Sequence, residues 1–71
     1  MNLPKALKLL RELHSINQVS LGDTLDLSPS YISDLEAGKR TPSLEVLESY
    51  SDFFSVPLSS IFALAETIHK P

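Results

Sequence analysis

The chain has 71 residues, no cysteine and a formal charge of −3 at pH 7, and 42% of its residues are hydrophobic. This length predicts one domain over residues 1–71, and without cysteine neither disulfides nor cysteine-ligated metal can stabilise it. No run approaches the ~20 apolar residues that cross a bilayer. The first residues lack the apolar core of a secretory signal. We therefore expect a cytoplasmic protein with a packed apolar core and no membrane contact.

The charges are unevenly distributed along the chain. Basic side chains occur early, and Lys39 and Arg40 are adjacent. After Arg40 only Lys70 is basic, whereas the acidic residues of this half are Glu45, Glu48, Asp52 and Glu66. A negative net charge disfavours phosphate contact, but local basic positions in the first half permit it on one side.

Five helices and no strand are predicted, the first from about Leu3 to His14. Pro4 is tolerated in its opening turn. Its apolar stripe has helical spacing and comprises Leu3, Ala6, Leu7, Leu10 and Leu13. The second helix starts at Asn17, a favourable N-cap, and ends near Leu25.

The third helix follows after a short turn. Asp26 lies in this turn and tolerates the left-handed conformation better than most residues. Ser28 as N-cap with Pro29 as first helical residue is a strong start signal, and Gly38 supplies a left-handed C-terminal cap. Residues 18–37 thus predict two short helices packed through a tight turn, with a core of Leu21, Leu25, Leu27, Ile32 and Leu35.

The last two helices complete an all-α chain. Ser43 caps the fourth helix, whose buried stripe is predicted as Leu44, Leu47, Tyr50 or Ser51, and Phe54. The fifth runs from about Leu58 to Ile68.

These residues resemble the Xre-type helix-turn-helix family of phage Cro and lambda-type repressors, over roughly residues 3–62. The resemblance rests on the order and spacing of several short segments rather than on any one of them. They are Asn17-Gln18, Leu21-Gly22, Leu25-Asp26-Leu27-Ser28, Ser30-Tyr31-Ile32-Ser33, Leu35 to Arg40, Pro42-Ser43-Leu44, Val56-Pro57-Leu58 and Ile61-Phe62.

The resemblance implies a compact five-helix DNA-binding domain with its third helix in the major groove. Gln18 matches a glutamine that touches the phosphate backbone and braces that helix, and Asn17 lies at the same helix N-terminus, where backbone N–H groups favour phosphate. Arg11 and Glu36 match an internal ion pair. Pro29, Ser30, Ser33 and Asp34 match positions facing base edges, and Tyr31, Lys39, Arg40 and Thr41 match positions contacting the flanking backbone.

The third helix departs from the family in its reading residues. It contains no Lys, Arg, Asn or Gln, the side chains that bind guanine or adenine through two hydrogen bonds. The carboxylate of Asp34 can accept a hydrogen bond from cytosine N4, but its negative charge repels phosphate. Sequence reading then depends on serine hydroxyls, Gln18 and DNA shape.

Several residues also have a plainer interpretation. Tyr31 can pack partly against the second helix, Asp34 can be a solvated carboxylate, and Lys39 with Arg40 can complement a helix dipole. His14 and His69 have no companion ligands, so neither a metal site nor a cofactor is expected. No histidine is placed to activate a serine, so the chain is not expected to be an enzyme.

The leading prediction is a sequence-specific transcriptional regulator, a repressor that binds a near-palindromic operator in double-stranded DNA as a homodimer. Because a small chain gains burial by pairing, the apolar pattern of residues 58–69 predicts a dimer surface of Phe62, Leu64, Ala65 and Ile68. The alternative is a protein-interaction module on the same scaffold, either antitoxin-like or a regulator that binds a partner protein.

Overall fold

A computed structural model describes residues 1–68 of the chain and contains five α-helices and no strand in that part. The helices are α1 (Leu3–Leu13), α2 (Gln18–Leu25), α3 (Pro29–Ala37), α4 (Leu44–Phe54) and α5 (Leu58–Thr67). The predicted all-α fold is confirmed. The first and fifth helices each end one residue earlier than predicted, because His14 and Ile68 serve as their C-terminal caps.

The helix ends use the predicted capping residues. Asn17, Ser28 and Ser43 each accept a hydrogen bond from the backbone N–H three residues later, at 2.8, 3.1 and 3.2 Å. Asp26 ends α2 in the left-handed conformation with φ of 58°, and Gly38 ends α3 with φ of 77°. Local sequence therefore sets where α2 and α3 begin and end.

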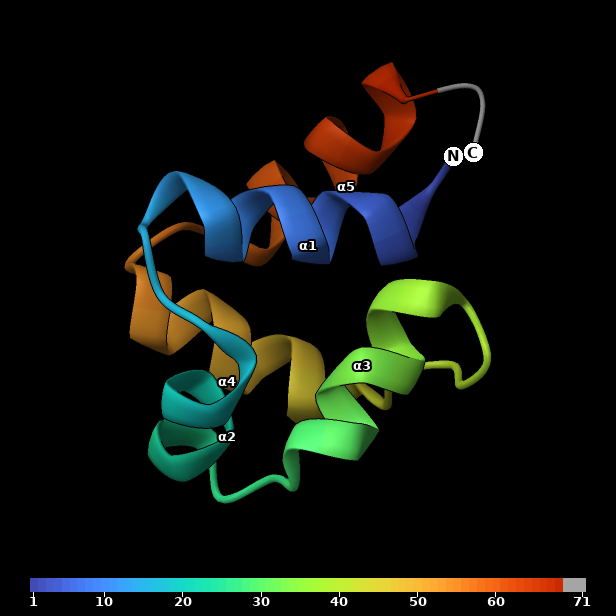
Figure 1. The fold of residues 1–71 in the computed structure, drawn as a ribbon. Coiled ribbons are helices and arrows are strands. Elements are labelled where there is room, and N and C mark those ends of the chain that lie inside the picture. Colours follow the sequence, from blue (N-terminus) through green and yellow to red (C-terminus); the bar gives the residue numbers. More distant parts are fainter. Residues whose placement is uncertain (69–71) are drawn as a thin grey trace.

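Helices α2, α3 and α4 form one group, and α1 and α5 pack together beside it, as Figure 1 shows. α1 runs between α5 on one side and the group of α2, α3 and α4 on the other, and its main neighbours are α5 and α3. The backbone N–H of Asn2 donates to the carbonyl of Ala65 at 2.9 Å, which joins the start of α1 to the end of α5. This arrangement leaves one side of α3 facing solvent.

Side chains from every helix fill the core. Tyr50 is its largest fully buried side chain. The remaining members of the buried cluster are Leu7, Leu10, Leu21, Ile32, Leu35, Leu47, Phe54 and Ile61. Between the predicted alternatives for α4, Tyr50 is buried and Ser51 is half-buried, while Leu25 and Leu27 of the motif are partly buried against this cluster.

Two residues of the predicted core lie outside it. Leu13 is 69% exposed and Leu44 is 60% exposed. Each is three residues from a buried leucine, and because a helix turns 3.6 residues per cycle, a three-residue step shifts a side chain by about 60° around the axis. Both leucines therefore lie at the edge of their helix's apolar stripe and at a helix end, where no neighbouring helix covers them.

Gly22 permits the close approach of α2 to the turn that precedes α3. A Cβ at this position would overlap the backbone carbonyl oxygen of Leu27, whose own N–H donates to the carbonyl of Gly22 at 2.8 Å. Any larger residue would push the turn away from α2. The turn geometry therefore depends on this glycine, and the angle between α2 and α3 depends on the turn.

Within residues 1–68, no helix has the length and apolar character required to cross a membrane.

Candidate nucleic-acid interface

The start of α2 is exposed and held by its cap. The Oδ1 atom of Asn17 accepts from the N–H of Ser20, which is one of the N–H groups at the positive end of the helix dipole. Asn17 itself is exposed and Gln18 is half-buried. The first N–H groups of a helix have no partner within it, so the start of α2 can bind an anion.

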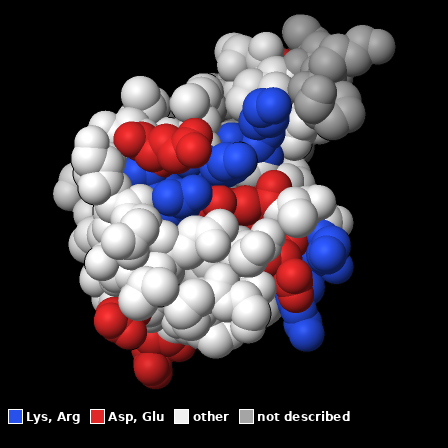
Figure 2. Space-filling view, viewed as in Figure 1, with Lys and Arg blue, Asp and Glu red and all other residues white. Residues whose placement is uncertain are grey.

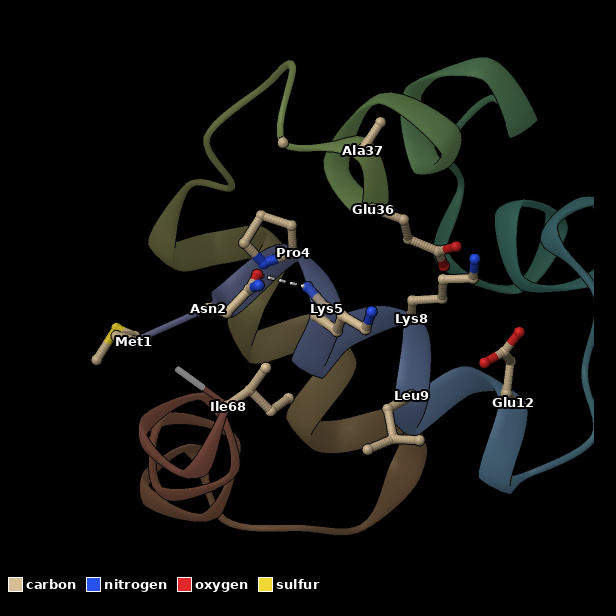
Figure 3. Close-up of a pocket in the computed structure, with 11 residues that line it drawn as sticks. Met1, Asn2, Pro4, Lys5, Lys8, Leu9, Glu12, Glu36, Ala37 and Ile68 are labelled. Atoms are coloured by element: carbon tan, nitrogen blue, oxygen red, sulfur yellow. Dashed lines mark hydrogen bonds between the residues drawn. The ribbon is translucent and has the colours of Figure 1, made fainter. Parts of the chain in front are cut away.

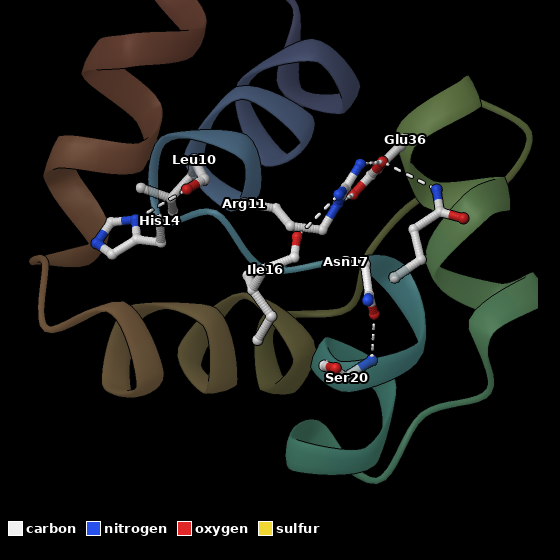
Figure 4. Close-up of polar contacts among 8 residues, drawn as sticks. Leu10, Arg11, His14, Ile16, Asn17, Ser20 and Glu36 are labelled. Carbon is white, nitrogen blue, oxygen red and sulfur yellow. Dashed lines mark hydrogen bonds and ion pairs between the residues drawn. The ribbon is translucent and has the colours of Figure 1, made fainter.

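A polar cluster between α1, α2 and α3 consists of Arg11, Gln18 and Glu36, and we call it the inner cluster. Figure 4 shows Arg11 and Glu36 pointing toward each other. The Nε and NH2 groups of Arg11 donate to the two carboxylate oxygens of Glu36 at 2.7 and 2.9 Å. The amide nitrogen of Gln18 donates to the same carboxylate at 3.1 Å. The Arg11 and Glu36 side chains are 11% and 4% exposed, so the predicted internal ion pair is present and almost completely enclosed.

The guanidinium of Arg11 also fixes the loop between α1 and α2. Its NH1 group donates to the carbonyl of Ile16 at 2.9 Å. Hydrogen bonding to Glu36 raises the pKa of Arg11 above its ordinary value, against the opposing effect of burial. The inner cluster thus braces α3 against α1 and α2, as the resemblance implied for Gln18.

The outward side of α3 carries Pro29, Ser30 and Ser33, all exposed, and we call these three residues with Asp34 the reading face. The hydroxyls of Ser28 and Ser30 lie 3.4 Å apart. Asp34 is half-buried. The reading face therefore offers hydroxyl and carboxylate groups to a ligand and contains no cation.

The loop after α3 folds back onto that helix. The backbone N–H groups of Lys39 and Arg40 both donate to the carbonyl of Asp34, at 2.9 and 3.3 Å. The Nε atom of Arg40 lies 3.7 Å from a carboxylate oxygen of Asp34, and we call these two residues the outer pair. The guanidinium carbon of Arg40 also lies 5.4 Å from the centre of the Tyr31 ring, within cation–π distance.

Tyr31 is partly buried, which agrees with the plainer interpretation of its position. Its ring is partly buried against the core and also lies beneath Arg40. Lys39, Arg40 and Thr41 are exposed. The structure therefore places all the predicted DNA-contacting residues on α3, the start of α2 and the loop that follows α3.

This side of the molecule has no continuous basic surface. Figure 2 shows Lys and Arg side chains next to Asp and Glu side chains across the region where α1 faces α3. A groove of about 840 Å³ lies there, between α1 and the end of α3 (Figure 3). Its charged lining residues are Lys5, Lys8, Glu12 and Glu36. Because Glu36 is enclosed and paired with Arg11, Glu12 is the one carboxylate of this lining that faces the two lysines without such a partner.

The predicted dimer surface on α5 needs one correction. Ala65 is fully buried, because it lies on the side of α5 that packs against α1, so it is a core residue and not a surface one. Phe62, Leu64 and Ile68 are half-buried and retain some exposed apolar area. Position 69, the end of the predicted surface, lies outside the described residues.

The single histidine of the described part has a structural environment. The Nδ1 atom of His14 is 2.9 Å from the carbonyl of Leu10, and its ring lies 4.6 Å from that of Phe54. No group of three or more potential metal ligands occurs among residues 1–68. His69 lies outside the described residues.

Comparison with known proteins identifies the family. The family model described as Helix-turn-helix matches residues 7–61. The immunity repressor protein of Bacillus phage phi105 is 31% identical over 70 residues, covering 99% of this chain and 48% of that protein. The competence pilus inhibition repressor of Acinetobacter baylyi is 35% identical over 68 residues, covering 96% of this chain and 62% of that protein.

A third relative shares a shorter segment. The uncharacterized HTH-type transcriptional regulator MJ1545 of Methanocaldococcus jannaschii is 44% identical over 50 residues, covering 69% of this chain and 21% of that protein. The chain thus spans between about a fifth and less than two thirds of the length of these three relatives.

Solved structures have the same arrangement of helices. The clp gene regulator ClgR from C. glutamicum superposes with a TM-score of 0.85 at 26% identity, covering 92% of this chain and 84% of that chain. The P22 c2 repressor protein, solved in complex with a synthetic operator, superposes with a TM-score of 0.76 over 86% of this chain and 92% of that one. At 21% identity this second likeness concerns the fold alone. With the family model matching most of its length, the chain belongs to the Xre-like helix-turn-helix family of DNA-binding transcriptional regulators.

Proposed function

We propose that this chain is a sequence-specific repressor that binds an operator in double-stranded DNA as a homodimer, with α3 in the major groove. One observation carries the proposal. The exposed reading face lies between two sets of groups suited to phosphate, the start of α2 on one side and the loop of residues 39–41 on the other. A helix flanked in this way fits the docking of a helix-turn-helix motif, in which phosphate contacts fix the position and base contacts specify the sequence.

The proposed phosphate contacts come from backbone and side-chain donors. The free N–H groups beside Asn17 favour an anion. An amide NH₂ group has two donors, so the bond from Gln18 to Glu36 leaves one for phosphate. The loop after α3 supplies further contacts through Lys39, Arg40 and Thr41. The hydroxyl of Tyr31 adds one from α3 itself.

The proposed base contacts are unusual for this family. The hydroxyls of Ser30 and Ser33 can donate or accept a hydrogen bond at a base edge, and Asp34 accepts one from cytosine N4. Pro29 contributes only apolar contact. Because no side chain of α3 makes two hydrogen bonds to a purine, DNA shape supplies part of the specificity.

For the dimer, we propose the exposed apolar edge of α5, formed by Phe62, Leu64 and Ile68, as the contact surface. Two copies related by a two-fold axis would present their α3 helices to successive major grooves about 34 Å apart. The operator would then be near-palindromic.

Selection of binding sites from random DNA, followed by salt titration, tests DNA recognition. We expect enrichment of a near-palindromic sequence and a linear fall of log affinity with log salt. Arg40→Ala should weaken binding to all sequences alike and flatten the salt slope, whereas Ser30→Ala should change the preferred bases at a cost of about 1 kcal/mol.

Lys5→Ala is the matched control for Arg40→Ala, because it removes the same charge from α1, outside the motif. A loss equal to that of Arg40→Ala would show that net charge, and not contact at the motif, governs binding. A change in base preference from Arg40→Ala would contradict the assignment of Arg40 to phosphate.

Sedimentation of Ile68→Asp tests the dimer surface. We expect the mass of a monomer for this variant and that of a dimer for Leu44→Asp, the control, which changes an exposed leucine on α4. A wild-type monomer, or a dimer that survives Ile68→Asp, would contradict the proposed surface.

A protein-interaction module is the second candidate. It is favoured by the net charge of −3 and by a reading face without a cation. Absence of any affinity for duplex DNA at low salt would exclude the repressor and support this alternative.

A further inference from the structure

The outer pair brings a cation of the loop after α3 close to a carboxylate of the reading face. Arg40 lies 3.7 Å from Asp34 while its guanidinium lies over Tyr31. We propose that Asp34 competes with DNA phosphate for Arg40, so that binding to any duplex must first separate the outer pair. This inference rests on the proposed function and adds to it a residue that sets the balance between non-specific and specific binding.

The geometry of the outer pair is that of an exchangeable contact. The distance of 3.7 Å is beyond hydrogen-bonding range, and the Arg40 and Asp34 side chains are 61% and 39% exposed. Ion pairs this open to water are weak, so an incoming phosphate can replace the carboxylate without disturbing the fold. A rigid support for Arg40 would need the short, double hydrogen bond that Arg11 makes with Glu36.

Few cations near α3 are available to phosphate, so the competition between Asp34 and phosphate affects DNA binding. α3 itself has no cation, and the loop that follows it has two, Lys39 and Arg40. Asp34 neutralises one of these two in the free protein. Only Lys39 then attracts phosphate without a competing carboxylate in contact.

The backbone holds the two partners within reach of each other. Because the N–H groups of Lys39 and Arg40 bond to the carbonyl of Asp34, the loop cannot carry Arg40 away from α3 while these bonds persist. The ring of Tyr31 contacts the guanidinium of Arg40 at cation–π distance. Exchange between Asp34 and a phosphate therefore needs only a change in side-chain conformation.

The consequence concerns specificity. A carboxylate that weakens an electrostatic contact common to every sequence lowers non-specific affinity. A contact common to every sequence does not by itself change the ratio of operator to non-specific affinity. The competition becomes sequence-dependent where a cytosine N4 group donates to Asp34, because that base contact also releases Arg40 to phosphate. Asp34 thus lowers the affinity for DNA without this base more than the affinity for the operator.

Binding of a random duplex by four proteins tests this proposal: wild type, Asp34→Asn, Arg40→Ala and the double variant. We expect Asp34→Asn to bind roughly twofold to fivefold more tightly than wild type, with a salt slope steeper by up to about 0.9. In the Arg40→Ala background the same change should give little or no gain. Asp52→Asn, an exposed position on α4, is the control for the change in net charge and should leave affinity nearly unaltered.

Three outcomes would overturn the inference while leaving the proposed function intact. An equal gain in the Arg40→Ala background would mean that Asp34 only repels phosphate. A loss of affinity in Asp34→Asn would mean that Asp34 positions Arg40, and no change would mean that the pair plays no part. If the wild-type chain binds no duplex at low salt, the proposed function fails, and the inference fails with it.

An NMR measurement on the free protein checks the pair itself. The Nε–H resonance of Arg40 should shift in Asp34→Asn and stay in place in Asp52→Asn. A resonance that does not respond to Asp34→Asn would show that the pair does not form in solution, which overturns the proposal.

Discussion

Two ion pairs involve α3, and they differ in almost every physical respect. The inner pair of Arg11 and Glu36 has two short hydrogen bonds, is nearly enclosed and is completed by Gln18 and the carbonyl of Ile16. The outer pair of Asp34 and Arg40 is a single long contact open to water. Enclosure makes the first a structural element that is costly to break, whereas exposure leaves the second free to exchange its partners.

The comparison explains how a small chain can position a helix firmly while keeping its contact groups available. The inner cluster faces the body of the protein and fixes α3 against α1 and α2. The outer pair lies near the same end of α3 but on another side of it, because Asp34 and Glu36 are two residues, about 200° of helical rotation, apart. Stability and binding therefore depend on different charged residues of the same helix and the loop that follows it.

The largest expected effect is on the inner pair. Arg11→Met removes the guanidinium and leaves the Glu36 carboxylate enclosed with only the Gln18 amide. We expect the free energy of unfolding to fall by about 3 kcal/mol, as for a buried pair that loses one partner. Urea unfolding measures this, and a loss below about 1 kcal/mol, typical of an exposed pair, would contradict the structural role of the inner cluster.

A change of opposite sign is expected at Tyr50. Its hydroxyl is buried with no hydrogen-bond partner in the described part of the chain. Tyr50→Phe removes this unsatisfied group and should raise the free energy of unfolding by about 1 kcal/mol. If this variant is destabilised instead, the hydroxyl has a partner in solution.

The same residue predicts a loss of stability at alkaline pH. Burial raises the pKa of Tyr50 well above its ordinary value, and the nearby Glu36 carboxylate raises it further. The unfolded chain loses this proton near pH 10 and the folded chain retains it, so this contribution to stability is complete below that pH and declines as the pH rises further. Between pH 8 and pH 11, the free energy of unfolding measured with urea should decline less for Tyr50→Phe than for wild type. Equal declines would contradict the proposed link between Tyr50 ionisation and stability.

The smallest effect is expected from the outer pair. Asp34→Ala should change the free energy of unfolding by less than about 0.5 kcal/mol, because the contact is long and both partners are open to water. Asp52→Ala, which removes an exposed carboxylate from α4, provides a matched control for the size of such effects. A loss of 2 kcal/mol or more from Asp34→Ala would remove the distinction between the two pairs.

The sequence was sufficient for local features that depend on neighbouring residues. The caps at Asn17, Ser28 and Ser43, the left-handed conformations at Asp26 and Gly38, and the helix count follow from short-range chemistry. The Arg11–Glu36 pair was implied by family resemblance, since a separation of 25 residues gives no local signal.

What the sequence could not predict depends on how the helices meet. Leu13 and Leu44 have the spacing of core residues, yet both are exposed because nothing covers the ends of their helices. Ala65 has the pattern of a surface extension, yet it is buried because α1 packs against it. The outer pair was likewise not predicted, although Asp34 and Arg40 were both candidate contacts, because it requires the loop to fold back onto α3.

Mapping a DNA titration by NMR tests the central claim most directly. With a duplex that carries the selected operator, the backbone amide resonances that move most should belong to residues 17–20, to α3 and to residues 39–41. The backbone amides of Arg11 and Glu36 should retain their protection from hydrogen exchange throughout. Shifts concentrated on α5 or on the outer side of α1, with the start of α2 and the reading face unaffected, would contradict the account.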